Sequence, residues 1–184
     1  MKFTNPSWAK LPDLPWRMAD PSSAILNGQM FVLGGYTAQT GYDMVYGKMY
    51  AWDGAQWVQK AAMPVPVWGQ ASVVYNNKMW VFGGMSATAD INTIQKYDPS
   101  TDTWEIVGEY PYNLGQGLYA TAVGKYAYIR FGNRGTNANT GIYFTRYDLE
   151  THECIVLTTP PSNTASPPPS ISQRGSDGAR PSSP

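Results

Sequence analysis

Short apolar runs alternate with turn-forming residues along most of the chain. Residues 70–75 and the run Met79 to Phe82 are rich in β-branched and aromatic side chains, and Asn76–Asn77 joins them. Because asparagine tolerates positive φ, this pattern predicts a β-hairpin with a tight turn. The second run leads directly into Gly83–Gly84, where we expect the strand to end.

Two more strands are predicted after a polar loop. One runs through Ile94 to Tyr97, and the turn sequence Asp98–Pro99–Ser100–Thr101 connects it to a strand around Trp104. Proline and aspartate are favoured in such turns because they restrict φ or bond to the nearby backbone. No ten-residue window has the apolar spacing of an amphipathic helix, so the sequence predicts an all-β fold built from four-stranded antiparallel units.

The same landmarks occur three times along the chain. The glycine pair Gly83–Gly84 has counterparts 49 residues away on each side, at Gly34–Gly35 and Gly132–Asn133. A tryptophan lies six residues before an apolar residue and proline in each copy: Trp8 before Leu14–Pro15, Trp57 before Met63–Pro64 and Trp104 before Tyr110–Pro111. An aromatic–Asp pair also recurs, at Trp52–Asp53, Tyr97–Asp98 and Tyr147–Asp148. Such periodicity indicates a repeat protein.

A four-stranded unit with a double glycine after its second strand, an aromatic–Asp pair and a tryptophan resembles the kelch repeat of β-propellers. The resemblance covers roughly residues 8 to 161 and implies three kelch-type blades that form an incomplete ring. The third copy departs from the pattern, since it has Asn133 for the second glycine and Cys154 for the tryptophan. Asparagine tolerates the left-handed conformation, whereas the cysteine removes a large packing contact.

The resemblance also implies structural roles for the repeated residues. We expect the glycines to allow positive φ and close packing, against aromatic residues of their own repeat. We expect the aromatic residues to pack between blades. The residues assigned these structural roles are Gly34, Gly35, Gly83, Gly84, Gly132, Trp57, Trp104 and Tyr97.

Composition limits the chemistry that the chain offers. Its formal net charge is zero, so a nucleic acid or membrane surface is not an expected partner, and a single cysteine excludes an intramolecular disulfide. Kelch-like propellers include copper-radical sugar oxidases similar to galactose oxidase, whose metal site needs two histidines, tyrosines and a crosslinked cysteine. Here His152 and Cys154, expected on an outer strand, are the only histidine and cysteine. We therefore expect no metal, no cofactor and no catalytic residue.

The loops of one propeller face are the candidate binding surface. In an up-and-down blade, the loop between strands two and three and the loop leading into the next blade emerge on the same face, which in kelch propellers commonly holds the partner peptide. The predicted partner-binding residues are Arg17, Trp68, Gln70, Gln116 and Arg134. The function expected is therefore a noncatalytic protein-interaction module that binds a protein or peptide partner on this face. The alternative is a carbohydrate-binding or carbohydrate-acting propeller, similar to the sugar oxidases or to sialic-acid mutarotases.

The ends of the repeat register lead to further expectations. Residues 1–161 are predicted to form the propeller segment, and the Ser/Pro-rich residues 162–184 a disordered tail, because the tail has too few apolar side chains to offset its ordering entropy. Trp8 to Leu11 is expected to be a lone fourth strand. The register reaches Pro160–Pro161 and stops, which suggests a truncated propeller or a homo-oligomer that completes a ring. The N-terminus has no apolar signal region, so a cytoplasmic location is expected.

Overall fold

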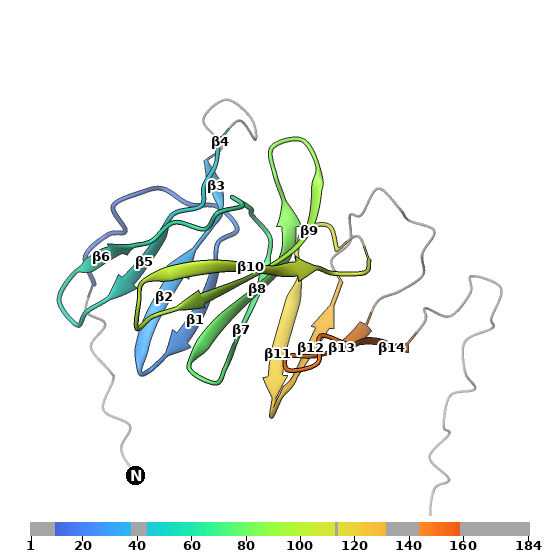
Figure 1. Ribbon diagram of the computed structural model, residues 1–184. Helices are drawn as coiled ribbons and strands as arrows, with labels where there is room; N and C mark the ends of the chain where they lie inside the picture. The colour runs from blue at the N-terminus through green and yellow to red at the C-terminus, as the bar shows by residue number, and fades with distance from the viewer. Residues whose placement is uncertain (1–9, 38–43, 113, 132–143, 159–184) are drawn as a thin grey trace, which may run out of the picture.

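Three four-stranded antiparallel sheets make up the fold, as the sequence predicts (Figure 1). The computed structural model of the chain describes residues 10–37, 44–112, 114–131 and 144–158. Blade 1 contains β1 (Ser22–Leu26), β2 (Gln29–Leu33), β5 (Met49–Trp52) and β6 (Trp57–Lys60). Blade 2 contains β7 (Ala71–Tyr75), β8 (Lys78–Met85), β9 (Asp90–Asp98) and β10 (Thr103–Glu109). Blade 3 contains β11 (Tyr119–Val123), β12 (Tyr126–Arg130), β13 (Phe144–Asp148) and β14 (Cys154–Thr158).

The first strands of the blades are the inner strands. β7 lies between β1 and β11, and the blades extend outward from these three strands (Figure 1). A short ribbon of β3 (Tyr36–Thr37) and β4 (Met44–Val45) projects from blade 1. The described part of the chain contains no helix with the length and hydropathy needed to cross a bilayer.

Hairpin turns form where the sequence predicts them. Asn76 and Asn77 have φ values of 47° and 55°, and the equivalent Asn27 and Gly28 have values of 52° and 76°. Two consecutive positive φ angles are typical of the type I′ turn, whose twist matches that of the flanking strands. The register of each hairpin therefore places alternate side chains on opposite faces of the blade.

Two apolar clusters hold neighbouring blades together. Blades 1 and 2 enclose one cluster, in which Phe31 packs on Tyr97 with ring centroids 5.9 Å apart. Blades 2 and 3 enclose the other, in which Phe82 contacts Tyr147 at 5.3 Å. Each blade is thus buried by its neighbour, as expected for a repeat fold whose units bury little alone.

The aromatic–Asp pairs and tryptophans mark equivalent places in the three blades. Strand register pairs Trp52 with Trp57, Tyr97 with Trp104 and Tyr147 with Cys154. The indole Nε1 of Trp57 donates to Pro12 O (3.1 Å), and that of Trp104 donates to Ala61 O (2.9 Å). These bonds attach the outer strand of one blade to the segment before it in the ring.

Cys154 occupies the tryptophan position of blade 3 and is half-buried. Its Sγ donates to Tyr110 Oη at 3.2 Å, and burial raises the pKa of the thiol. His152 differs from its predicted place on a strand, since it lies in the preceding turn with φ 65°. Its imidazole is exposed and stacks on Tyr147, with ring centroids 6.0 Å apart.

The glycine pairs lie where blades meet the segments that lead into the inner strands. We call these segments connectors: residues 10–21 before β1, residues 61–70 before β7, and residues 110–112 and 114–118 before β11. A Cβ on Gly34 would lie 2.6 Å from Val67 O, and one on Gly83 would lie 2.6 Å from Leu114 Cδ1. The first glycine therefore contacts the connector of the next blade.

The second glycine of each pair contacts the connector of its own blade. A Cβ on Gly35 would lie 2.8 Å from Ala19 O, and one on Gly84 would lie 2.8 Å from Trp68 O. The contacts are thus mainly with connector backbone, aliphatic side chains and the Gln70 amide, whereas aromatic rings of the same repeat were expected. The strand also continues farther than predicted, since β8 passes through Gly83–Gly84 with a register shift between Phe82 and Gly84.

Several expectations concern the ends of the described region. Lys10 and Leu11 belong to no strand, so the predicted strand from Trp8 to Leu11 is not formed by its described residues. Gly132, Asn133, Arg134 and the predicted tail lie outside the described residues.

Blade 3 exposes the apolar side chains of Tyr119, Val123, Ile155 and Leu157. A homo-oligomer that covers these side chains remains a prediction.

Replacing Gly83 with alanine tests the close approach of Leu114 to this glycine. We expect Gly83→Ala to lower the free energy of unfolding by about 2–4 kcal/mol, because φ is 55° and the new Cβ overlaps Leu114. Gly124→Ala is the matched control: its φ is 57°, but no atom lies within 4 Å of the added Cβ. Strain alone should cost the control about 1 kcal/mol in urea unfolding. Equal losses for the two variants would contradict the contact.

The aromatic–Asp turns predict acid sensitivity. The ion pair with Lys78, together with bonds from Ser100, lowers the pKa of Asp98 to about 2, and Lys125 lowers that of Asp148 to about 2. Carboxylates with depressed pKa values stabilise the fold above their unfolded pKa, near 4, and this stability is lost as pH falls toward 2. We therefore expect Asp98→Asn to flatten the decline of unfolding free energy between about pH 4 and pH 2.

Denaturant unfolding at several pH values measures this effect. Asp53→Asn is the control, because Asp53 accepts the same turn bonds from Ala55 N and Gln56 N but pairs with no lysine of the described residues. Its substitution should flatten the decline less. A profile for Asp98→Asn that matches the unmodified chain would show that the Lys78 pair does not contribute.

Candidate functional site

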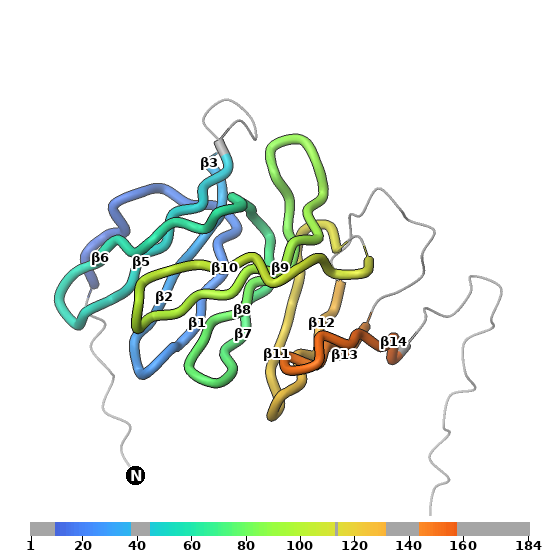
Figure 2. Tube along the Cα trace, in the orientation of Figure 1, coloured from blue at the N-terminus to red at the C-terminus, as the bar shows by residue number. Residues whose placement is uncertain are grey.

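The connectors enter the inner strands through equivalent turns. Ala19 forms an antiparallel bridge with Tyr36, and Trp68 forms one with Met85. In blades 1 and 2 the start of the loop between the second and third strands therefore lies beside the incoming connector, so in these blades the two loops share one face. Figure 2 shows the chain path through these turns.

A residue with positive φ follows at each turn. Asp20, Gly69 and Gly117 have φ values of 50°, 64° and 72°. Glycine adopts this conformation without strain, and aspartate is among the few other residues that tolerate it. The turn redirects the chain from the rim of the face into the inner strand.

Backbone hydrogen bonds connect the three turns to one another. Gly69 N donates to Asp20 O at 3.1 Å, and Leu118 N donates to Gly69 O at 3.1 Å. A Cβ on Gly69 would lie 2.9 Å from Gly117 N, so a larger residue does not fit between the turns. The three turns consequently form one continuous wall.

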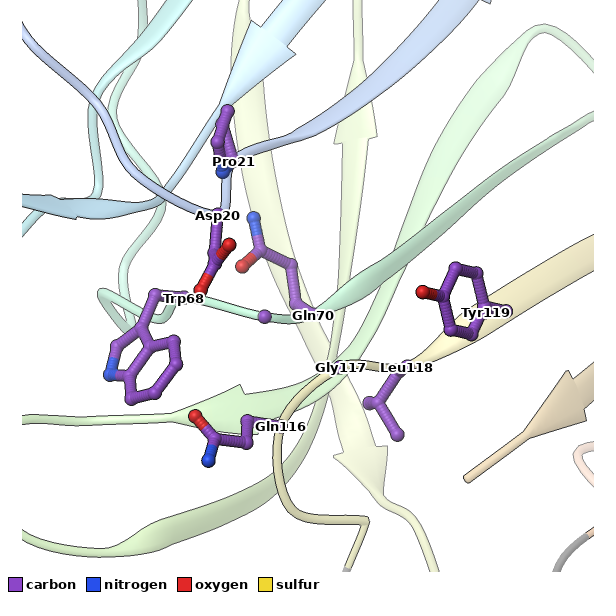
Figure 3. A pocket seen from close by; sticks show the side chains of 9 residues that line it. Asp20, Pro21, Trp68, Gln70, Gln116, Gly117, Leu118 and Tyr119 are labelled. Carbon is purple, nitrogen blue, oxygen red and sulfur yellow. The ribbon is translucent and has the colours of Figure 1, made fainter. Parts of the chain in front are cut away.

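A pocket of about 460 Å³ lies at this wall, at the ends of the inner strands (Figure 3). Its lining residues come from all three blades: Asp20, Pro21, Trp68, Gly69, Gln70, Gln116, Gly117, Leu118 and Tyr119. The volume is within the range of small-ligand sites, and the lining combines two aromatic rings with amide and carboxylate groups. No group of His, Cys, Asp and Glu side chains in the described residues is arranged to hold a metal ion.

Three of the five predicted partner-binding residues meet in this pocket. Trp68 and Gln70 come from one connector, and Gln116 from the next connector lines the same cavity. Arg17 is exposed on the first connector and does not line the pocket, while Arg134 lies outside the described residues.

Trp68 forms part of the pocket wall. Its side chain is only 5% exposed and packs on Tyr36, with ring centroids 4.8 Å apart. The indole Nε1 donates to Ser86 O at 3.4 Å. The residue therefore attaches the connector to the loops of blades 1 and 2.

Gln70 is more deeply buried than a rim residue would be. Its side chain is 3% exposed, and Nε2 donates to Leu33 O of blade 1 at 2.9 Å. Its Oε1 is buried without a hydrogen-bond partner in the described part of the chain. Gln116, by contrast, is half-buried.

Sequence reasoning missed Asp20 and Tyr119. Asp20 occupies the position of Gly69 and Gly117, so aligning the three turns would have found it. Tyr119 is 67% exposed at the start of β11, where its counterparts at the start of the other inner strands are smaller. Neither residue belongs to a sequence motif that would have identified it.

Comparisons with known proteins find similarity to kelch-repeat proteins. The Kelch motif model matches residues 69–109, which span blade 2. Kelch-like protein 25 of Rattus norvegicus is 32% identical over 103 residues, covering 54% of this chain and 16% of the relative. Kelch repeat and BTB domain-containing protein 1 of Horsepox virus is 25% identical over 101 residues, covering 54% of this chain and 18% of the relative.

Blade 2 thus carries a Kelch motif, and about half of the chain is similar in sequence to kelch-repeat proteins. A solved structure titled "Structure of YjhT" superposes with a TM-score of 0.70 and 20% identity, over 85% of this chain and 56% of that one. At this identity the likeness concerns the fold. The chain spans less than a fifth of the length of these two curated relatives.

The two pocket glutamines should respond differently to truncation. We expect Gln70→Ala to lower the free energy of unfolding by about 1–3 kcal/mol, because Leu33 O loses its partner inside the protein. The matched Gln116→Ala should stay within about 0.5 kcal/mol of the unmodified chain. Urea unfolding of both variants measures the difference. Equal stabilities would show that Gln70 does not join blades 1 and 2.

Proposed function

We propose that this chain is a noncatalytic protein-interaction module. It binds a segment of a partner protein on the face that carries the connector turns at Asp20, Gly69 and Gly117. The observation that carries the proposal is the pocket at the inner strands, to which all three blades contribute. Its residues stand on strands and turns that the inter-blade bonds hold in place. A rigid scaffold of this kind lowers the entropic cost of binding.

The pocket lining supports recognition of a peptide. Tyr119 presents an exposed ring, and Gln116 offers an amide that both donates and accepts hydrogen bonds. Aromatic side chains are enriched among residues that dominate binding energy at protein interfaces. In kelch propellers this face commonly holds the partner peptide, which favours the same assignment.

A carbohydrate ligand is the second candidate. Its support is the same combination of aromatic, amide and carboxylate groups around a pocket of about 460 Å³. These groups also suit sugar hydroxyls, which donate and accept hydrogen bonds. A glycan array with the purified chain distinguishes this candidate from the first.

Selection from a random peptide display library tests the interaction function. We expect peptides that bind the full 184-residue chain, and we expect Gln116→Ala to weaken them about fivefold in fluorescence anisotropy, because it removes pocket contacts. Lys60→Ala, on the outer strand β6 of blade 1, is the control and should bind as the unmodified chain does. Arg17→Ala removes the same charge as Lys60→Ala, but on the first connector. Comparing the affinities of the two variants shows whether this connector contributes to peptide binding.

Two results would contradict the proposal. One is a library that yields no binding peptide while the glycan array yields a ligand. The other is a set of peptides whose affinity Gln116→Ala leaves unchanged, since these peptides would then bind elsewhere on the chain.

A further inference from the structure

One hydrogen-bond acceptor at the pocket is buried without a partner among the described residues. The orientation of the Gln70 amide is set by Leu33 O, because a carbonyl oxygen accepts only from the NH₂ end of the amide. Oε1 is therefore the atom left over, buried and unpartnered among the described residues. A buried acceptor without a donor is costly, so a ligand that donates to it gains more than a solvent-exposed bond would give.

Asp20 adds a negative charge at the same place. Its carboxylate is exposed, and no lysine or arginine in the described ranges forms an ion pair with it. Figure 3 shows the Asp20 side chain and the amide oxygen of Gln70 turned toward each other in the pocket. A group with several donors that enters here would bond to both acceptors.

Aromatic groups complete the site. Tyr119 lies across the pocket from Asp20, with its hydroxyl directed toward the cavity (Figure 3). The Tyr119 side chain is 67% exposed, so its ring is accessible to a cation, and the Asp20 carboxylate attracts the same positive charge. The described residues that line the pocket include no lysine or arginine, so none of them repels a positive group.

We propose that this pocket binds a cationic side chain, preferably arginine, of the partner segment, a proposal that rests on the interaction function above. The planar guanidinium carries several N–H donors, so it donates to the Asp20 carboxylate and to Gln70 Oε1 at once. Its flat face also packs on an aromatic ring. Lysine has the charge but lacks this planar set of donors, and it binds more weakly.

Titration of the full chain with N-acetyl-arginine amide, followed by ¹H–¹⁵N NMR, tests the proposal. The side-chain amide of Gln70 and the indole N–H of Trp68 should shift saturably. N-acetyl-citrulline amide, which has nearly the same shape without the charge, should bind about fivefold more weakly. N-acetyl-lysine amide carrying a free ε-ammonium should lie between them.

Asp20→Asn removes the charge while keeping a residue that tolerates φ 50°. We expect this variant to bind the arginine probe about fivefold more weakly than the unmodified chain. Asp13→Asn is the matched control, since Asp13 is an exposed carboxylate on the same connector that does not line the pocket. It should leave the affinity unchanged. Added salt supplies a second measurement on the unmodified chain, and it should weaken arginine but not citrulline.

Two results would overturn the proposal that the pocket binds a cationic side chain. One is equal affinity for the arginine and citrulline probes. The other is an Asp20→Asn variant that binds the arginine probe as well as Asp13→Asn does. Selected peptides separate either result from failure of the interaction function. If those peptides lack basic residues but remain sensitive to Gln116→Ala, the cationic pocket is wrong and the interaction function stands. If no peptide binds, both proposals fail.

Discussion

The close approach of the connectors to the glycine pairs of blades 1 and 2 is the contact on which the arrangement of the described structure depends. A connector passes over the glycine pair of the blade before it and then bridges to the glycine pair of its own blade. Val67 O and Trp68 O lie where side chains on Gly34 and Gly84 would otherwise extend. Glycine is required at these points both for its positive φ and for its lack of Cβ. The spacing between blades follows from this contact.

Polar side chains inside the fold hold the connectors in register. Gln95 Oε1 accepts from Val65 N at 2.9 Å, and Gln95 Nε2 donates to Val65 O at 2.9 Å. Both backbone groups of one connector residue are thereby satisfied in a part-buried place, where an unpaired group would be costly. Gln70 performs a similar task toward Leu33, but it satisfies only one end of its own amide. Both ends of the Gln95 amide are therefore bonded, whereas Gln70, which lines the pocket, keeps one unbonded end.

Most of the fold follows from local features that are visible directly in the sequence. The Asn76–Asn77 turn depends on the conformational preference of two adjacent residues, and the alternation of apolar side chains depends on the period of a strand. The repetition of the landmarks at a fixed spacing predicts how many blades the chain forms. The strand end at Gly83 was harder to predict, because positive φ suits both a strand terminus and a bulge. Only the pairing of β8 with β9 distinguishes them.

Neighbouring residues and short periods set the strands, the turns and the repeated landmarks, so all three could be predicted from the sequence. The burial of Gln70, the partial exposure of Gln116 and the meeting of both with Asp20 at one pocket depend on how the blades pack. Their relative positions come from the packing of three blades around the inner strands. The residues that meet are about 50 positions apart in the chain, and no local preference encodes which side chains then share a cavity.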